Sequence, residues 1–155
     1  MRCLSFRQPW LDLLISGKKT IEIRTWNTHY RGPLLLHAAK QVDKEAYERL
    51  VKEGILSIQY RPTVGAVVAK GILRDVFRYT SAAHFNQDAV SHLNPCMNEE
   101  EFRFGFDERL FGWGFTDIHP LREPLPLRGQ LSFFEVPVKG EKNRVLKNLR
   151  RKREK

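Results

Sequence analysis

Residues 8–26 have the sequence QPWLDLLISGKKTIEIRTW, in which the pattern of a short helix is followed by that of a strand. Proline suits the first position of a helix, and the apolar residues that follow Pro9 recur on one face. Glycine is the residue that most often ends a helix, so Gly17 marks the expected stop. The sequence therefore predicts a short, half-buried helix between Pro9 and Gly17.

The segment Thr20 to Trp26 alternates between apolar and polar side chains, which is the period of a β-strand. Alternation predicts that Ile21 and Ile23 are buried on one face of the sheet. Glu22 and Arg24 then share the other face, roughly 7 Å apart, given a rise of about 3.3 Å per residue. We expect this pair to face a concave site.

Further elements are expected along the rest of the chain. A helix should begin after Asp43, a suitable N-cap, and end at Gly54. Short helical turns are expected between residues 82 and 92. Further β-strands are expected at residues 33–38, 64–79, 111–121 and 131–138. The sum is an α+β fold, pictured as a small β-barrel of about five mainly antiparallel strands with two or three helices.

The formal net charge of +9 is concentrated at the C-terminal end. Residues 139–155 contain nine Lys or Arg and two Glu, so we expect a folded domain over residues 1–138 and a basic tail over 139–155. Such a tail can contact phosphates, here through Lys147, Arg150, Arg151, Lys152 and Arg153. The alternatives are a tail that is merely solvated and one that contacts a protein partner.

No apolar run reaches the roughly 18 residues that span a bilayer, and charges interrupt the first residues, which excludes a signal-peptide core. We therefore expect a cytoplasmic protein with no membrane contact. Cys3 and Cys96 have no CxxC or His-rich context, and the histidines are scattered, so neither a metal site nor a cofactor is expected.

The run from Gly17 to Arg24 has the form G-x-K-x-x-E-x-R and follows Gln8-Pro9-Trp10. In this it resembles ASCH (activating signal cointegrator homology) domains of the PUA-like superfamily. The resemblance extends over roughly residues 3–138, through Trp26, Tyr30-Arg31-Gly32, His37-Ala38, Gly71, Trp113 and the segment 129–136. It implies a PUA-like barrel with a cleft beside the helix and the signature strand, in a family widely proposed to bind or act on RNA.

Candidate ligand-binding residues surround that signature. Glu22 can accept a hydrogen bond from a base amine, Arg24 can grip a carbonyl or phosphate, and Lys19 would add a mobile charge from the turn. Aromatic side chains could stack on a base. The full set is Gln8, Pro9, Trp10, Lys19, Glu22, Arg24, Trp26, Tyr30, Arg31, His37 and Lys40. The alternatives are an ion pair on a solvated sheet face, tryptophans that pack in the core, and a structural histidine.

We expect a module that binds RNA, another single-stranded nucleic acid or a nucleotide, and in which Glu22→Ala or Arg24→Ala weakens binding with little loss of stability. The alternatives are a coactivator-type protein-interaction domain and a hydrolase, such as a ribonuclease or an N4-acetylcytidine amidohydrolase, with Lys19 and Glu22 as catalytic residues. Of the catalytic residues of the small amidohydrolases that this chain resembles, only the lysine is matched, by Lys19. Glu22 occupies the position of their threonine nucleophile, and Lys70 that of their assisting glutamate, so deacetylation is not expected.

Overall fold

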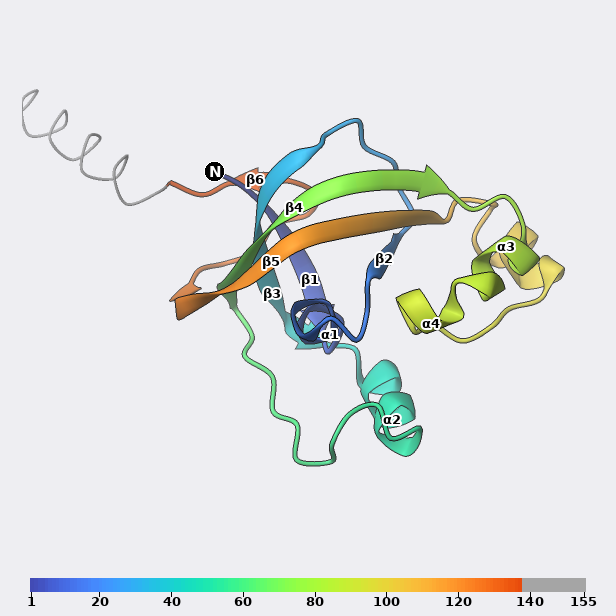
Figure 1. Cartoon of the computed structure of the whole chain (residues 1–155), viewed down its shortest axis with the longest axis horizontal. Coiled ribbons are helices and arrows are strands. Elements are labelled where there is room, and N and C mark those ends of the chain that lie inside the picture. The colour runs from blue at the N-terminus through green and yellow to red at the C-terminus, as the bar shows by residue number, and fades with distance from the viewer. Residues whose placement is uncertain (138–155) are drawn as a thin grey trace, which may run out of the picture.

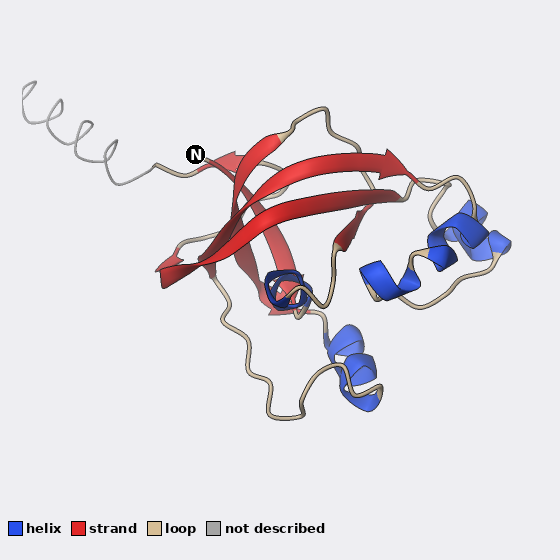
Figure 2. Ribbon diagram, viewed as in Figure 1, coloured by secondary structure: helices blue, strands red, loops and turns tan. Residues whose placement is uncertain are grey.

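A computed structural model describes residues 1–137, which form a curved sheet with helices beside it (Figures 1 and 2). The tail contacts expected at residues 147–153 lie outside the described residues. None of the helices in residues 1–137 combines the length and apolarity needed to cross a membrane. The elements are β1 (Arg2–Gln8), α1 (Trp10–Ser16), β2 (Ile21–Arg24), β3 (Gly32–Val42), α2 (Lys44–Lys52), β4 (Ala66–Arg78), α3 (Ala82–Gln87), α4 (Ala89–His92), the π-helix η1 (Glu101–Gly105), β5 (Phe111–Pro126) and β6 (Phe134–Glu135).

The strands form one sheet in the order β2-β5-β4-β3-β1-β6, antiparallel except for the pair of β1 and β3. This confirms an α+β fold on a mainly antiparallel sheet, with six strands instead of about five. The unexpected strand is β1. Its adjacent residues Cys3 and Leu4 are both buried, so it lacks the alternation by which a half-buried strand is recognised.

The sheet curls without closing, so "barrel" describes it only loosely. The expected strand at 131–138 is reduced, within the described residues, to the two residues of β6, which pair only with Arg2 and Cys3 of β1. In residues 1–137 no ladder connects β1 to β2, which pairs with β5 alone. Instead, the Arg24 guanidinium of β2 donates a 2.8 Å hydrogen bond to the Ser5 carbonyl of β1. A side chain thus bridges the gap between the two strands.

The expected helices are present. Gly17 ends α1 with a φ of 80°, a conformation that glycine adopts at little cost. The Asp43 carboxylate caps α2 by accepting the Ala46 N–H at 3.1 Å. The helical turns expected at 82–92 are α3 and α4, which lie with η1 beyond one end of β4 and β5 (Figure 1).

The largest core cluster joins α1 to the inner face of the sheet. Leu11 and Leu14 of α1 pack with Phe6, Leu36 and Trp113 from three strands. Because α1 is anchored on this core, the residues that immediately follow it are held beside β1 and β2.

Candidate functional site

A cleft of about 480 Å³ lies where β1 and β2 are bridged by Arg24 and not by a ladder. Its walls come from β1, α1, β2 and the residues after it, β3, the loop after α4, the loop after η1 and the segment before β6. The sequence signature supplies its charged centre, since Lys19, Glu22 and Arg24 all line it.

In this centre Glu22 lies between two cations. Its Oε1 is 3.1 Å from Lys19 Nζ, and its Oε2 is 3.4 Å from Arg24 Nη2. The exposed fraction of the side chain is 1% for Lys19, 8% for Glu22 and 18% for Arg24. One carboxylate therefore serves two buried cations, and the group carries a formal charge of +1.

Lys19 is held firmly, which corrects the expectation of a mobile charge. Its ammonium donates a 3.3 Å hydrogen bond to the His92 carbonyl and lies 4.2 Å from the centroid of the Trp10 ring. Burial is the main influence on the pKa of Lys19 and lowers it, while Glu22 opposes this shift.

Glu22 and Arg24 are also constrained. Burial by itself would raise the pKa of Glu22, but Lys19 and Arg24 outweigh it, so that the pKa of Glu22 lies below its usual value. The Arg24 guanidinium lies over the Phe6 ring at 4.7 Å, and among the described residues its buried Nε has no hydrogen-bond partner. A hydrogen-bond acceptor on a ligand could bind the Arg24 Nε–H only if it reached this buried position beside the Phe6 ring.

The two faces of β2 differ from the expected pattern. Glu22 is buried, at 6% exposure, whereas Ile21 and Ile23 are only half-buried. The polar face turns into the curl of the sheet toward β1, while Ile23 packs at the margin of a separate cluster around Tyr79. The expectation that Glu22 is partly exposed is therefore wrong, and with it the reason for expecting that Glu22→Ala costs little stability.

Five of the expected site residues line the cleft: Trp10, Lys19, Glu22, Arg24 and Trp26. Trp26 also belongs to the core, since its ring contacts Trp113 edge to face at 4.6 Å between centroids. Trp10 is fixed by a 3.0 Å hydrogen bond from its indole N–H to Asp43.

The other six expected residues do not line the cleft: Gln8, Pro9, Tyr30, Arg31, His37 and Lys40. Three of them instead support the backbone nearby. Gln8 accepts the Asp12 N–H in the first turn of α1, and Pro9 is buried and accepts the Leu13 N–H. His37 is buried between Ser5 Oγ at 2.9 Å and the Leu127 carbonyl at 2.8 Å, which satisfies both ring nitrogens.

The remaining three are Tyr30, Arg31 and Lys40. The Tyr30 hydroxyl donates to the Pro33 carbonyl, and Arg31 donates to the carbonyls of Thr28 and Tyr30. These bonds stabilise the turn before β3. Lys40 is exposed near the far end of β3.

Several cleft residues were missed by the sequence patterns: Arg7, Asn94, Phe106 and Leu131. Arg7 is on the unrecognised strand β1. The others lie in loops, where no periodicity indicates direction. Phe106 and Leu131 are large apolar residues with 39% and 96% exposure, so the cleft has an apolar rim.

The sequence model of the ASCH domain matches residues 4–109, more than half of the chain. The chain belongs to the ASCH domain family. Activating signal cointegrator 1 of Mus musculus and that of Homo sapiens are each 50% identical to this ASCH chain over 36 residues, which make up 23% of this chain and 6% of theirs. The match thus spans a small fraction of those relatives.

Solved structures with the same fold include ASCH from Zymomonas mobilis. It has a TM-score of 0.59 and 15% identity, covering 94% of this chain and 93% of that chain. A point mutant of the same protein gives a TM-score of 0.58 and 14% identity, with 94% of each chain covered. At these identities the likeness shows the fold of this ASCH domain alone.

Proposed function

We propose that this ASCH domain binds RNA or a nucleotide in the cleft, through the group formed by Lys19, Glu22 and Arg24. The observation that carries the proposal is the surplus positive charge of this buried group. Buried charges are costly unless they are compensated, and an anionic or strongly accepting ligand would supply the missing partner. Phosphates and base carbonyls are such groups.

The contacts of Glu22 indicate how the group would work. Its Oε1 accepts from Lys19 and from the Ile23 N–H at 3.2 Å, and its Oε2 pairs with Arg24. A carboxylate engaged in this way holds two cations in place. We therefore assign Glu22 a positioning function, in place of the hydrogen bond to a base amine that its residue type alone suggests.

The surroundings suit a base beside the charged group. Trp10, Trp26 and Phe106 line the same cleft, and aromatic faces stack on nucleic-acid bases for about 1–3 kcal/mol each. Membership of the ASCH family, which has been proposed to bind RNA, also supports this ligand class.

The test is a titration of the full chain with a fluorescein-labelled single-stranded RNA of about eight nucleotides, at fixed salt. Arg24→Gln keeps a polar side chain but removes the charge, so affinity should fall about tenfold, as expected when a charge-assisted hydrogen bond is removed. Arg74→Gln, at an exposed arginine of β4 outside the cleft, is the matched control. Equal affinities for the two variants, with unfolding curves that show both to be folded, would refute the proposal.

A hydrolase is the second candidate, and the lowered pKa of Lys19 favours it, because a lysine of this kind can act in acid–base catalysis. The geometry gives it less support than binding. Lys19 Nζ is already engaged with Glu22 and His92, and Thr20, the nearest hydroxyl in sequence, is exposed and does not line this cleft.

A further inference from the structure

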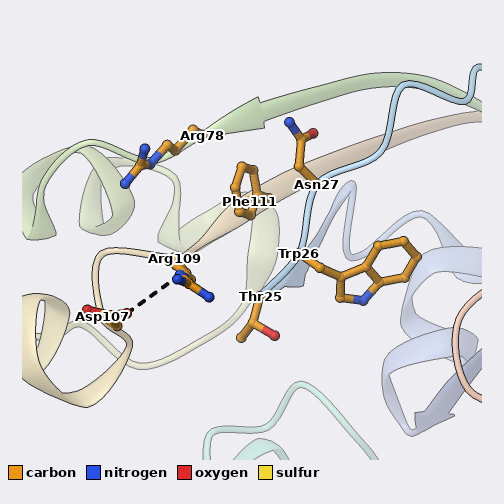
Figure 3. A pocket seen from close by; sticks show the side chains of 7 residues that line it. All are labelled: Thr25, Trp26, Asn27, Arg78, Asp107, Arg109 and Phe111. Atoms are coloured by element: carbon orange, nitrogen blue, oxygen red, sulfur yellow. Dashed lines mark ion pairs between the residues drawn. The ribbon is translucent and has the colours of Figure 1, made fainter.

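A second hollow, of about 570 Å³, lies next to the cleft (Figure 3). Thr25 and Trp26 line both, so the two spaces meet along the chain that leaves β2. The Trp26 indole points away from the arginines of the hollow and packs on Trp113 and Phe133. The segment after β2 therefore separates the cleft from the hollow, and one extended ligand could cross it to occupy both.

The hollow contains two arginines that a ligand can reach. Arg78 is exposed at the end of β4 and is oriented by hydrogen bonds from its guanidinium to the Glu108 carbonyl, at 3.3 and 3.1 Å. The Arg109 side chain is 69% exposed, and its Nε lies 3.5 Å from an Asp107 carboxylate that is itself 84% exposed. An exposed pair of this kind is weak, so a phosphate can compete with Asp107 for Arg109.

Charge in the described part of the chain is concentrated at these two spaces. Residues 1–137 have 18 cationic and 16 anionic side chains, a net charge of +2. The cleft and hollow together hold five of the cations (Arg7, Lys19, Arg24, Arg78 and Arg109) and two of the anions (Glu22 and Asp107), a net charge of +3. The remaining surface of residues 1–137 is therefore slightly negative, and an anionic chain would be drawn to this groove.

We propose that the cleft and the hollow form one continuous site for a single-stranded oligonucleotide, in which Arg78 and Arg109 hold the phosphate next to the nucleotide in the cleft. This inference rests on the proposed nucleotide binding and adds that the ligand is a strand and not a mononucleotide. A cationic groove interleaved with aromatic side chains is the arrangement that binds single strands. Here the aromatic groups are Phe106, Trp26 and Phe111. Bases can stack on such rings, whereas an acidic peptide would bind through the cations alone, so the aromatic groups favour a nucleic acid.

The test compares a ribonucleoside 5′-monophosphate with a single-stranded RNA tetranucleotide, by calorimetric titration of the full chain at several salt concentrations. Arg109→Gln and Arg78→Gln should each weaken tetranucleotide binding about threefold to tenfold and reduce the slope of log affinity against log salt by about 0.7, while monophosphate affinity stays the same. Arg122→Gln, at an exposed arginine of β5 outside both spaces, should change neither.

Asp107→Asn provides a test in the opposite direction. It removes the anion that competes for Arg109, so tetranucleotide affinity should rise severalfold. The Asp107 φ of 52° lies in the left-handed region, which asparagine also adopts readily, so this variant should fold.

The outcomes separate the two proposals. If the monophosphate binds but hollow variants bind the tetranucleotide like the unchanged chain, the strand site is refuted while nucleotide binding stands. If neither ligand binds, nucleotide binding itself fails. If a hexaglutamate peptide binds more tightly than the tetranucleotide and loses affinity in Arg109→Gln, the groove is a peptide site and the strand proposal is overturned.

Discussion

Lys19 Nζ lies 3.1 Å from Glu22 Oε1 in an ion pair whose side chains keep 1% and 8% of their exposure. Both residues line the cleft, where Arg24 adds a second cation to the same carboxylate. The three side chains proposed to bind a ligand are therefore also the ones whose charges compensate one another inside the domain.

Glu22→Ala should destabilise the fold strongly. Removing this carboxylate leaves two buried cations without their counter-charge, a change that typically costs about 3–5 kcal/mol. Urea unfolding followed by circular dichroism measures the loss. The control is Glu53→Ala at the C-cap of α2, which breaks an ion pair to Arg49 of the same 3.1 Å length but with Glu53 47% exposed. That change should cost less than about 1 kcal/mol, and equal losses at the two sites would contradict the compensating function of Glu22.

Stability should fall as the pH drops below about 6.5, the ordinary pKa of histidine, because of His92. His92 is fully buried, its Nε2 lies 2.8 Å from the Phe85 carbonyl, and its Nδ1 accepts the Asn94 N–H at 3.0 Å. Burial lowers the pKa of His92, an effect that the Phe85 carbonyl opposes and the nearby Lys19 reinforces. The unfolded chain therefore takes up a proton that the folded chain resists, so the stabilisation is present above this pH and is lost as the pH falls.

The measurement is the free energy of unfolding between pH 7.5 and pH 5.5, where the loss through one group is at most about 1.4 kcal/mol per pH unit. His92→Phe should reduce this pH dependence, whatever its effect on stability at pH 7.5. If the variant and the unchanged chain lose stability in parallel, another group is responsible.

Deleting residues 139–155 should leave the domain folded but weaken its binding to single-stranded RNA. These residues carry a net charge of +7, and for each phosphate that they neutralise, the deletion should lower the slope of log affinity against log salt by about 0.7. Titrations of the full and shortened chains at several salt concentrations give this slope. An unchanged slope would mean that the tail does not bind phosphate.

The chain should not release cytidine from N4-acetylcytidine. Thr20 is exposed and does not line the cleft, and Lys70 is exposed on β4, where it pairs with Leu35 and His119, so neither joins Lys19 and Glu22 in an amidohydrolase arrangement. Chromatography of the nucleoside after incubation with the protein detects any turnover. Release that Lys19→Ala abolishes would favour the hydrolase over the binding module.

The sequence by itself determined several of the local elements and the family. The stop at Gly17, the cap at Asp43 and the strand from Ile21 to Arg24 depend on contacts between residues close in the chain, and such contacts leave a pattern in the sequence. The run from Gly17 to Arg24 likewise identified the ASCH family and the charged centre of the cleft.

Only the tertiary structure decided which face of β2 is buried and what surrounds it. Alternation assigns Glu22 and Arg24 to one face, but whether that face is covered depends on the curl that brings β1 opposite, through the contact between Arg24 and Ser5. The same holds for Tyr30 and His37, which form hydrogen bonds to other segments and do not line the cleft, and for Phe106 and Leu131, which enter it from distant loops. Such contacts join segments far apart in the sequence, and no local period records them.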